Sequence, residues 1–185
     1  MKEVTQKDLD EYKLYIEHCA KDNNTQLLAA HGELYMSTLI SVMLRYTKNI
    51  VRLYCHSFNG IFVINQSCWN ALRTFLNEGK DIRILYDTND DKDNMLMLLL
   101  HMEKEKRSRK DSIGVKLITN ADRNKICESV AEEYYKFGVF DDNKFMVEYT
   151  PDELKSFASF NRPDASKFLI KLFDAAFKNS KEIIL

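Results

Sequence analysis

Three short apolar segments at regular spacing constrain the fold of this chain more than any other feature of its sequence. They are Ile50–Cys55, Asp81–Tyr86 and Val115–Ile118, and they begin about 30 residues apart, the length of a βαβ repeat. Each segment is short and rich in branched apolar residues, as buried strands are. Because strands at this spacing are joined by crossover helices, the sequence predicts a β-α-β-α-β unit with a parallel sheet.

The two intervals between these strands carry helical patterns. The first helix is predicted to be capped by Ser67 and to end at Gly79, with an apolar face made of Trp69, Leu72, Phe75 and Leu76. The second runs into the charged segment Glu103–Lys110, with its apolar face at Met95, Leu98, Leu99 and Met102. The expected core therefore includes large apolar side chains from helices and strands alike: Trp69, Phe75, Leu85, Leu117, Phe137 and Phe173.

The segments on either side of this unit have other patterns. Apolar residues at helical spacing predict helices near residues 6–20 and 25–47, separated by the polar segment Asp22–Asn24. We therefore expect residues 1–48 to form a helical segment packed on an α/β domain of residues 49–185. After the third strand, alternating residues predict a hairpin around Asp141–Asn143 and a further strand at Ser156–Phe160. A closing helix begins at Pro163, with Phe168, Leu169, Leu172, Phe173 and Ala176 on one face.

Composition excludes several classes of protein. The chain has 185 residues, of which 45% are apolar, and a net charge of −1, so no global positive field draws it to nucleic acid or acidic membranes. No apolar run approaches the length of about 18 residues that a membrane span needs. Residues Met1–Thr5 contain no apolar signal-peptide core, and we expect a cytoplasmic chain with no membrane partner. The four cysteines match no zinc spacing, so we expect reduced thiols, no metal and no cofactor.

A small set of polar residues in the last third could carry chemistry. Lys136 and Asp141 stand five residues apart on the first strand and turn of the predicted hairpin, and Tyr134 stands two residues before the lysine. Further along, Ala158–Asn161 reads Ala-Ser-Phe-Asn, with Ser159 and Asn161 just before the closing helix. These residues and the order of the predicted elements resemble one half of the phospholipase D superfamily. Its signature is a His, one residue, a Lys, four residues and an Asp, followed by a Gly-Ser-x-Asn turn.

The resemblance implies a fold and a mechanism. The fold it implies is α/β, a phospholipase D-like half with a mainly parallel β-α-β-α-β sheet, a C-terminal hairpin, an extra strand and a helix, preceded by two N-terminal helices. In the family, two motifs meet across a pseudo-dyad, often in a homodimer. One His attacks the phosphodiester and the other protonates the leaving group. The Lys and Asn bind phosphate oxygens, and the Asp orients the His.

This chain departs from that pattern at the residue that matters most. Tyr134 stands where the family has His, and a phenol with a pKa of about 10 cannot replace an imidazole as a proton shuttle near neutral pH. Ala158 replaces the Gly, and the interval that precedes it is longer than usual, with the surplus at Thr150–Glu153. The resemblance therefore implies the fold more strongly than the activity. A vestigial phosphate-binding set would comprise Tyr134, Lys136, Asp141, Ser159 and Asn161.

Three other groups of residues are candidates. His56 directly follows a predicted strand, where ligands bind in α/β sheets, and it could lie near Lys136; as a lone histidine it could equally be a hydrogen-bonded structural residue. The acidic loop Asp87–Asp93 lacks the glycine and glutamate of a calcium loop, so we interpret it as the acidic start of a helix. One basic cluster could contact a polyanion or simply form a solvated helix end: Lys104, Lys106, Arg107, Arg109 and Lys110.

These observations support three interpretations of function. The first is a non-catalytic phospholipase D-like binding or regulatory module, acting as a homodimer and binding either a ligand or a protein partner. The second is a residual phosphodiesterase or nuclease that acts as a dimer. The third is a protein-interaction subunit without a ligand. Nucleic-acid binding through the basic cluster is an alternative that the near-neutral net charge disfavours.

Overall fold

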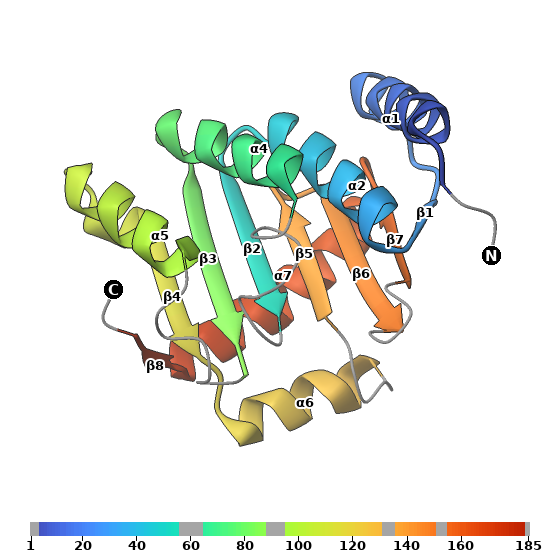
Figure 1. Ribbon diagram of the computed structural model, residues 1–185. Coiled ribbons are helices and arrows are strands. Elements are labelled where there is room, and N and C mark those ends of the chain that lie inside the picture. The colour runs from blue at the N-terminus through green and yellow to red at the C-terminus, as the bar shows by residue number, and fades with distance from the viewer. Residues whose placement is uncertain (1–3, 56–64, 88–94, 131–135, 151–154, 184–185) are drawn as a thin grey trace.

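A single mixed sheet runs through the centre of the molecule, with helices on both of its faces (Figure 1). The computed structural model describes residues 4–55, 65–87, 95–130, 136–150 and 155–183. The strand order is β1-β7-β6-β5-β2-β3-β4-β8. The strands are β1 (Leu28–His31), β2 (Ile50–Cys55), β3 (Asp81–Tyr86), β4 (Ile113–Leu117), β5 (Lys136–Phe140), β6 (Lys144–Thr150), β7 (Lys155–Ser159) and β8 (Lys181–Glu182). The α-helices are α1 (Gln6–Lys21), α2 (Glu33–Arg45), α4 (Gln66–Asn77), α5 (Met95–Lys106), α6 (Asn120–Val130) and α7 (Pro163–Asn179).

The predicted β-α-β-α-β unit is confirmed. Strands β2, β3 and β4 pair in parallel, with Leu53 opposite Ile84 and Ile84 opposite Val115. Helices α4 and α5 provide the two crossovers on the same side of the sheet (Figure 1). The carboxyl ends of these three strands therefore lie at one end of the sheet, which is where α/β proteins bind ligands.

The remaining strands pair antiparallel, so the parallel arrangement is confined to this central unit. Strand β5 runs against β2, and the hairpin β5–β6 continues through β7 to β1. At the other edge the two-residue strand β8 pairs with β4. Of the seven described ladders, two are parallel and five are antiparallel, because hairpin connections reverse the chain after β5 and the closing segments come back along the edges.

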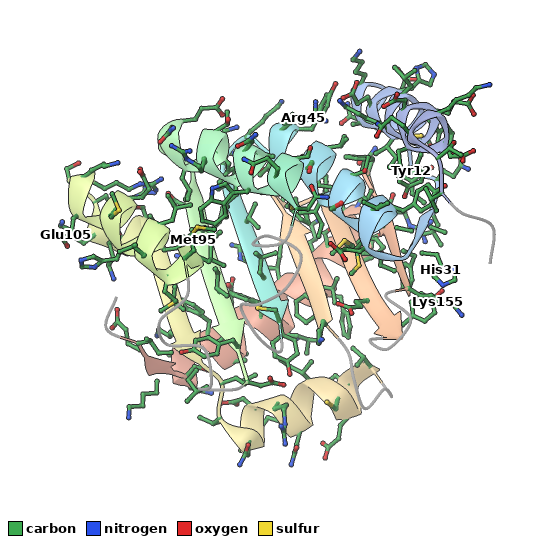
Figure 2. All side chains as sticks on the ribbon, in the orientation of Figure 1. Tyr12, His31, Arg45, Met95, Glu105 and Lys155 are labelled. Carbon is green, nitrogen blue, oxygen red and sulfur yellow. The ribbon has the colours of Figure 1, made fainter. Side chains whose placement is uncertain are left out.

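The predicted helix over residues 25–47 is wrong in its first turns. Leu28–His31 forms β1, in which Leu28 and Ala30 are buried while Ala29 and His31 are exposed. Strand β1 pairs with β7, with His31 opposite Lys155 at the edge of the sheet (Figure 2). Gly32 has a positive φ of 85°, which a helix interior does not tolerate, and α2 begins directly after it. Instead of a purely helical N-terminal segment, the chain therefore contributes an edge strand.

Two apolar clusters fill the space on the two faces of the sheet. Residues of α1, α2, α4 and α5 pack with Val51, Leu53 and Ile84 on one face. Residues of α6 and α7 pack with Leu85, Phe137 and Val139 on the other. The alternation of the strands divides them between the faces, so neighbouring residues such as Leu53 and Tyr54 belong to different clusters.

Several local predictions need correction. The N-cap of α4 is Asn65, whose Oδ1 accepts hydrogen bonds from the N–H groups of Ser67 (3.0 Å) and Cys68 (3.3 Å), so Ser67 is inside the helix. The buried face of α5 is not the predicted one, and three of its predicted apolar residues are about half exposed: Met95, Leu98 and Met102. Met95 stands at the start of α5, and Glu105 lies near its end (Figure 2).

The expected core is largely correct. Phe75, Leu85, Phe137 and Phe173 are buried, whereas Trp69 and Leu117 are partly buried at the margin of a cluster. Phe168, which was expected on the inner face of the closing helix, is 47% exposed. Helix α6 and strand β8 were not predicted. In α6 only Asp122 and Ile126 are buried, so its sequence lacks an apolar stripe, and β8 is too short to leave a pattern.

Candidate functional site

A row of polar side chains crosses four strands at the end of the sheet where β2 finishes and β5 begins. Tyr54 is opposite Phe137, which places Cys55 beside Lys136. Lys136 is opposite Glu148 on β6, and Glu148 is opposite Ser156 on β7. Because paired residues point to the same face of a sheet, all four share the face that α2 and α4 cover. We call Cys55, Lys136, Glu148 and Ser156 the polar row.

The charges of the polar row influence one another. Burial raises the pKa of the Cys55 thiol to about 12; Lys136 opposes this shift, while the carboxylates of Asp87 and Glu148 add to it. The thiol is therefore protonated at neutral pH and is not a nucleophile. Burial also raises the pKa of Glu148, and the Lys136 ammonium again acts in the opposite direction. A carboxyl with a raised pKa beside a lysine can donate or accept a proton nearer to neutrality than an exposed glutamate can.

Ser156 completes the row from the β7 side. Ser156 is only 1% exposed, and its hydroxyl has no hydrogen-bond partner among the described residues. A buried hydroxyl without a partner is uncommon, because its desolvation is not compensated. Cys55, Glu148 and Ser156 were not identified from the sequence. What brings them to Lys136 is the register of the β5–β6–β7 meander, in which alternate residues of β6 lie on the same face of the sheet as Lys136.

Asp141 lies at the opposite end of β5 from Lys136, and its carboxylate is hydrogen-bonded to groups of the protein itself. Its carboxylate accepts hydrogen bonds from the N–H groups of Lys48 (2.9 Å) and Asn49 (2.8 Å). It also accepts one from the Lys144 ammonium at 2.9 Å, and both side chains of this pair are more than nine-tenths buried. Burial alone would raise the pKa of Asp141, but these hydrogen bonds outweigh it and the pKa is lowered. The carboxylate thus ties the hairpin turn to the segment before β2.

Ser159 and Asn161, expected beside Lys136, are not brought to it. Ser159 is opposite Phe145, three positions along β6 from the Glu148 row, which is about 10 Å along the strands. Asn161 continues in the same direction, toward the turn where the Arg162 N–H donates to the carbonyl of Asn143 at 2.8 Å. Strand β7 runs antiparallel to β6, so its end returns to the Asp141 end of the sheet. Tyr134 and His56 lie outside the described residues.

The predicted basic cluster is engaged within the molecule. Arg107 donates hydrogen bonds to the carbonyls of Lys80 (2.8 Å) and Leu76 (2.7 Å), which ties the end of α5 to the segment between α4 and β3. The other four cations each have a carboxylate partner: Lys104 with Glu182, Lys106 with Glu103, Arg109 with Asp81 and Lys110 with Glu105. The cluster therefore stabilises the helix end, and its charge is largely compensated.

Two structural features are absent from the described part of the chain, a group of potential metal ligands and a membrane-spanning helix. No three histidine, cysteine or carboxylate side chains gather there as a metal would require. The acidic loop after β3 lies outside the described residues beyond Asp87. None of the described helices combines the length and the apolar character needed to cross a membrane.

Comparison with known proteins places this architecture among phospholipase D-like structures. The chain is similar to Nuc, a phospholipase D family member from Salmonella typhimurium, with a TM-score of 0.61 and 12% identity over 86% of this chain and 99% of that one. It is similar to NucT from Helicobacter pylori, with a TM-score of 0.56 and 8% identity over 85% and 100% of the two chains. No family model matches the sequence, and no curated protein matches it either.

A third similar structure extends the range of functions found on this fold. It is TrmBL2, an archaeal chromatin protein described as showing a novel mode of DNA binding, with a TM-score of 0.57 and 12% identity. The similarity covers 94% of this chain and 62% of that one. At these identities the comparisons establish the phospholipase D-like fold, and function has to be inferred from the site.

Proposed function

We propose that this chain is a non-catalytic phospholipase D-like binding or regulatory module that acts as a homodimer. The observation that carries the proposal is the make-up of the polar row. Of the residues that the resemblance assigns to phosphate transfer, Lys136 lies in the row, Ser159 and Asn161 lie toward the other end of the sheet, and position 134 is a tyrosine. The described members of the row include no imidazole.

Without that imidazole, covalent capture and proton transfer lack their usual group. Acid–base help alone is typically worth about two to four powers of ten in rate, and covalent capture is lost with it, so we expect turnover to fall to background. Lys136 would still attract an anion, and the Ser156 hydroxyl would still be able to donate a hydrogen bond. The row is therefore suited to binding, with Glu148 limiting the net positive charge that a ligand meets.

The test is hydrolysis of bis(p-nitrophenyl) phosphate with and without a chelator, because the family mechanism needs no metal. We expect no turnover above background in the native chain, and none in Tyr134→His, since Asn161 remains at the far end of the sheet. Metal-independent cleavage by the native chain that disappears in Lys136→Ala would overturn the non-catalytic proposal.

The homodimer follows from the resemblance to half of a two-motif site. A C2 arrangement with the polar rows near the two-fold axis would supply the second half. Static light scattering at tens of micromolar protein is expected to give about twice the chain mass of 21.7 kDa. A single-chain mass at that concentration would contradict this part of the proposal.

One observation favours the alternative of a residual phosphodiesterase. Glu148 combines burial, a raised pKa and a neighbouring cation, which together are characteristic of general acids and bases. If the chain retains hydrolysis, Glu148→Gln should abolish it, whereas Glu182→Gln on the exposed strand β8 should not. A different observation favours the third interpretation, an interaction subunit without a ligand: the half-exposed side chains of Met95, Leu98 and Met102 lie on α5 at spacings of three and four residues.

A further inference from the structure

A second group of charged residues lies on the central parallel strands, on the face of the sheet opposite to the polar row. Val51, Ile82 and Val115 belong to the apolar cluster on the face that α2 and α4 cover. Because side chains alternate along a strand, the charged residues next to them lie on the opposite face, which α7 crosses (Figure 1). Arg52 is directly opposite Arg83, and Lys116 on β4 is opposite Leu85, two residues further along β3. We call Arg52, Arg83 and Lys116 the α7-face cation cluster.

One carboxylate serves both arginines of this cluster. The Oδ1 atom of Asp174, on α7, lies 3.2 Å from Nε of Arg52 and 3.8 Å from Nη1 of Arg83. Adjacent strands are separated by about 4.8 Å, so the two guanidinium groups converge on the same point. The Arg52 side chain is 14% exposed, and it therefore holds its charge in a poorly solvated place, where a full counter-charge is valuable.

An aromatic ring fixes the other end of the cluster. The Lys116 Nζ lies 4.6 Å from the centroid of the Phe177 ring, and the central guanidinium carbon of Arg83 lies 5.7 Å from the same centroid. Gly114 makes room for this ring, since a Cβ atom at that position would come within 2.8 Å of it. The cations are thus held in place by packing, which lowers the entropy cost of binding a ligand.

Other carboxylates near the cluster are already paired. Asp81, on the same face of β3, forms an ion pair with Arg109, and Glu182, opposite Lys116 on β8, lies 3.9 Å from Lys104. Arg52 and Arg83 share Asp174, and Lys116 contacts the Phe177 ring, so among the described residues the three cations and this one carboxylate leave a surplus of two positive charges. Helix α7 adds two exposed lysines near Asp174, Lys171 three residues before it and Lys178 four residues after it.

We propose that the α7-face cation cluster is a binding site for a phosphate group, separate from the polar row. A phosphate monoester carries up to two negative charges, which equals the surplus on the cluster. Two neighbouring guanidinium groups can each donate hydrogen bonds to phosphate oxygens, and a single carboxylate leaves some of these N–H donors unused. Asp174 occupies the place of the anion and competes with it for Arg52 and Arg83. The phosphate could belong to a small phosphorylated molecule or to a nucleic-acid backbone.

The experiment measures binding of two probes to the full chain, inorganic pyrophosphate by calorimetry and a labelled 12-base-pair DNA duplex by fluorescence anisotropy. The double variant Arg83→Gln/Lys116→Gln should weaken the binding of whichever probe binds the native chain by roughly tenfold or more, because losing charge-assisted hydrogen bonds has an effect of that size. The control Lys7→Gln on α1 changes the charge at a side chain that is 84% exposed and should have no effect. Binding of pyrophosphate alone would assign the site to a small ligand, and binding of both to a nucleic-acid backbone.

Asp174→Asn tests the same proposal in the other direction. It removes the competing charge and should tighten binding several-fold, which a damaged fold could not do. The proposal is overturned if neither probe binds, or if the double variant binds as tightly as the native chain. Pyrophosphate binding that is lost in Lys136→Gln and kept in the double variant would place the anion at the polar row, and the function proposed above would then stand without this second site.

Discussion

Asp141 shows how one side chain can fix a turn. The residue has a positive φ of 58°, and its carboxylate holds two backbone N–H groups and the buried Lys144 ammonium. Asparagine tolerates the same backbone conformation but cannot compensate the buried charge. We expect Asp141→Asn to lower the free energy of unfolding by about 3 kcal/mol at pH 7, because the buried Lys144 ammonium loses its counter-charge and keeps only the Asn143 side chain at 3.3 Å. The control Asp142→Asn, at an exposed neighbour, should change it little.

The effect of this substitution should depend on pH. The pKa of Asp141 in the folded chain is below its ordinary value of 3.8, so its contribution is complete above that value and is lost as the pH falls through the lowered pKa. The difference in unfolding free energy between the native chain and Asp141→Asn should therefore shrink below about pH 4. Urea unfolding at pH 7 and pH 3 measures it, and a difference that grows in acid would contradict the assigned ionisation.

A second residue-scale prediction concerns the polar row. Lys136 lowers the pKa of Glu148, while burial raises it. Replacing Lys136 by methionine removes the opposing charge, so the pKa of Glu148 should rise further above its ordinary value. Carbon-detected NMR of the glutamate carboxyl groups follows the titration directly. Lys155→Met is the matched control, since Lys155 is adjacent to Ser156 on β7 but points to the other face. Equal shifts in both variants would mean that the two charges do not interact directly.

At the scale of elements, α7 packs against the face of the sheet opposite to α2 and α4. Phe173 is fully buried and stacks on Phe177 with ring centroids 5.5 Å apart. Phe173→Ala should cost about 3–5 kcal/mol of unfolding free energy, as for buried aromatic residues generally. Phe168→Ala on the same helix should cost less than about 1 kcal/mol, because that side chain is 47% exposed. Similar midpoints in urea for the two variants would show that α7 does not pack as described.

The elements that could be predicted are those whose own residues carry a complete pattern. Strands β2 and β3 are short segments rich in branched apolar residues, each with one arginine inside it, and α7 begins at a proline and carries an apolar stripe. Strand β1 could not be separated from α2, because Leu28 and Ala30 fit either period until β7 pairs with them. In the same way, Lys136 was identified from its motif, whereas Glu148 and Ser156 depend on strand register, which is set by tertiary pairing.

At the scale of the whole molecule, the first 48 residues are joined closely to the rest. Helix α2 buries eight of its residues against α4 and the sheet, and β1 adds an edge strand. We expect residues 49–185 produced alone to lose a sharp urea transition, since the faces beneath α2 would be open to water. The full chain, unfolded under the same conditions, is the control. A cooperative transition of the fragment, with a slope in proportion to its length, would show instead that residues 49–185 form an independent domain.

The pairing of β1 with β7 has a consequence for how the chain reaches this state. Leu28–His31 leaves the ribosome early, yet its partner on β7 lies about 125 positions later, a separation that makes closure slow. The β8 segment, which covers the other edge, is made later still. Neither edge of the sheet can be completed before β7 and β8 have been made, so the nascent chain carries unpaired strand edges while the strands between them are synthesised. Closure of both edges is therefore a late folding event, in which β1 and β8, far apart in the sequence, complete the two sides of one sheet.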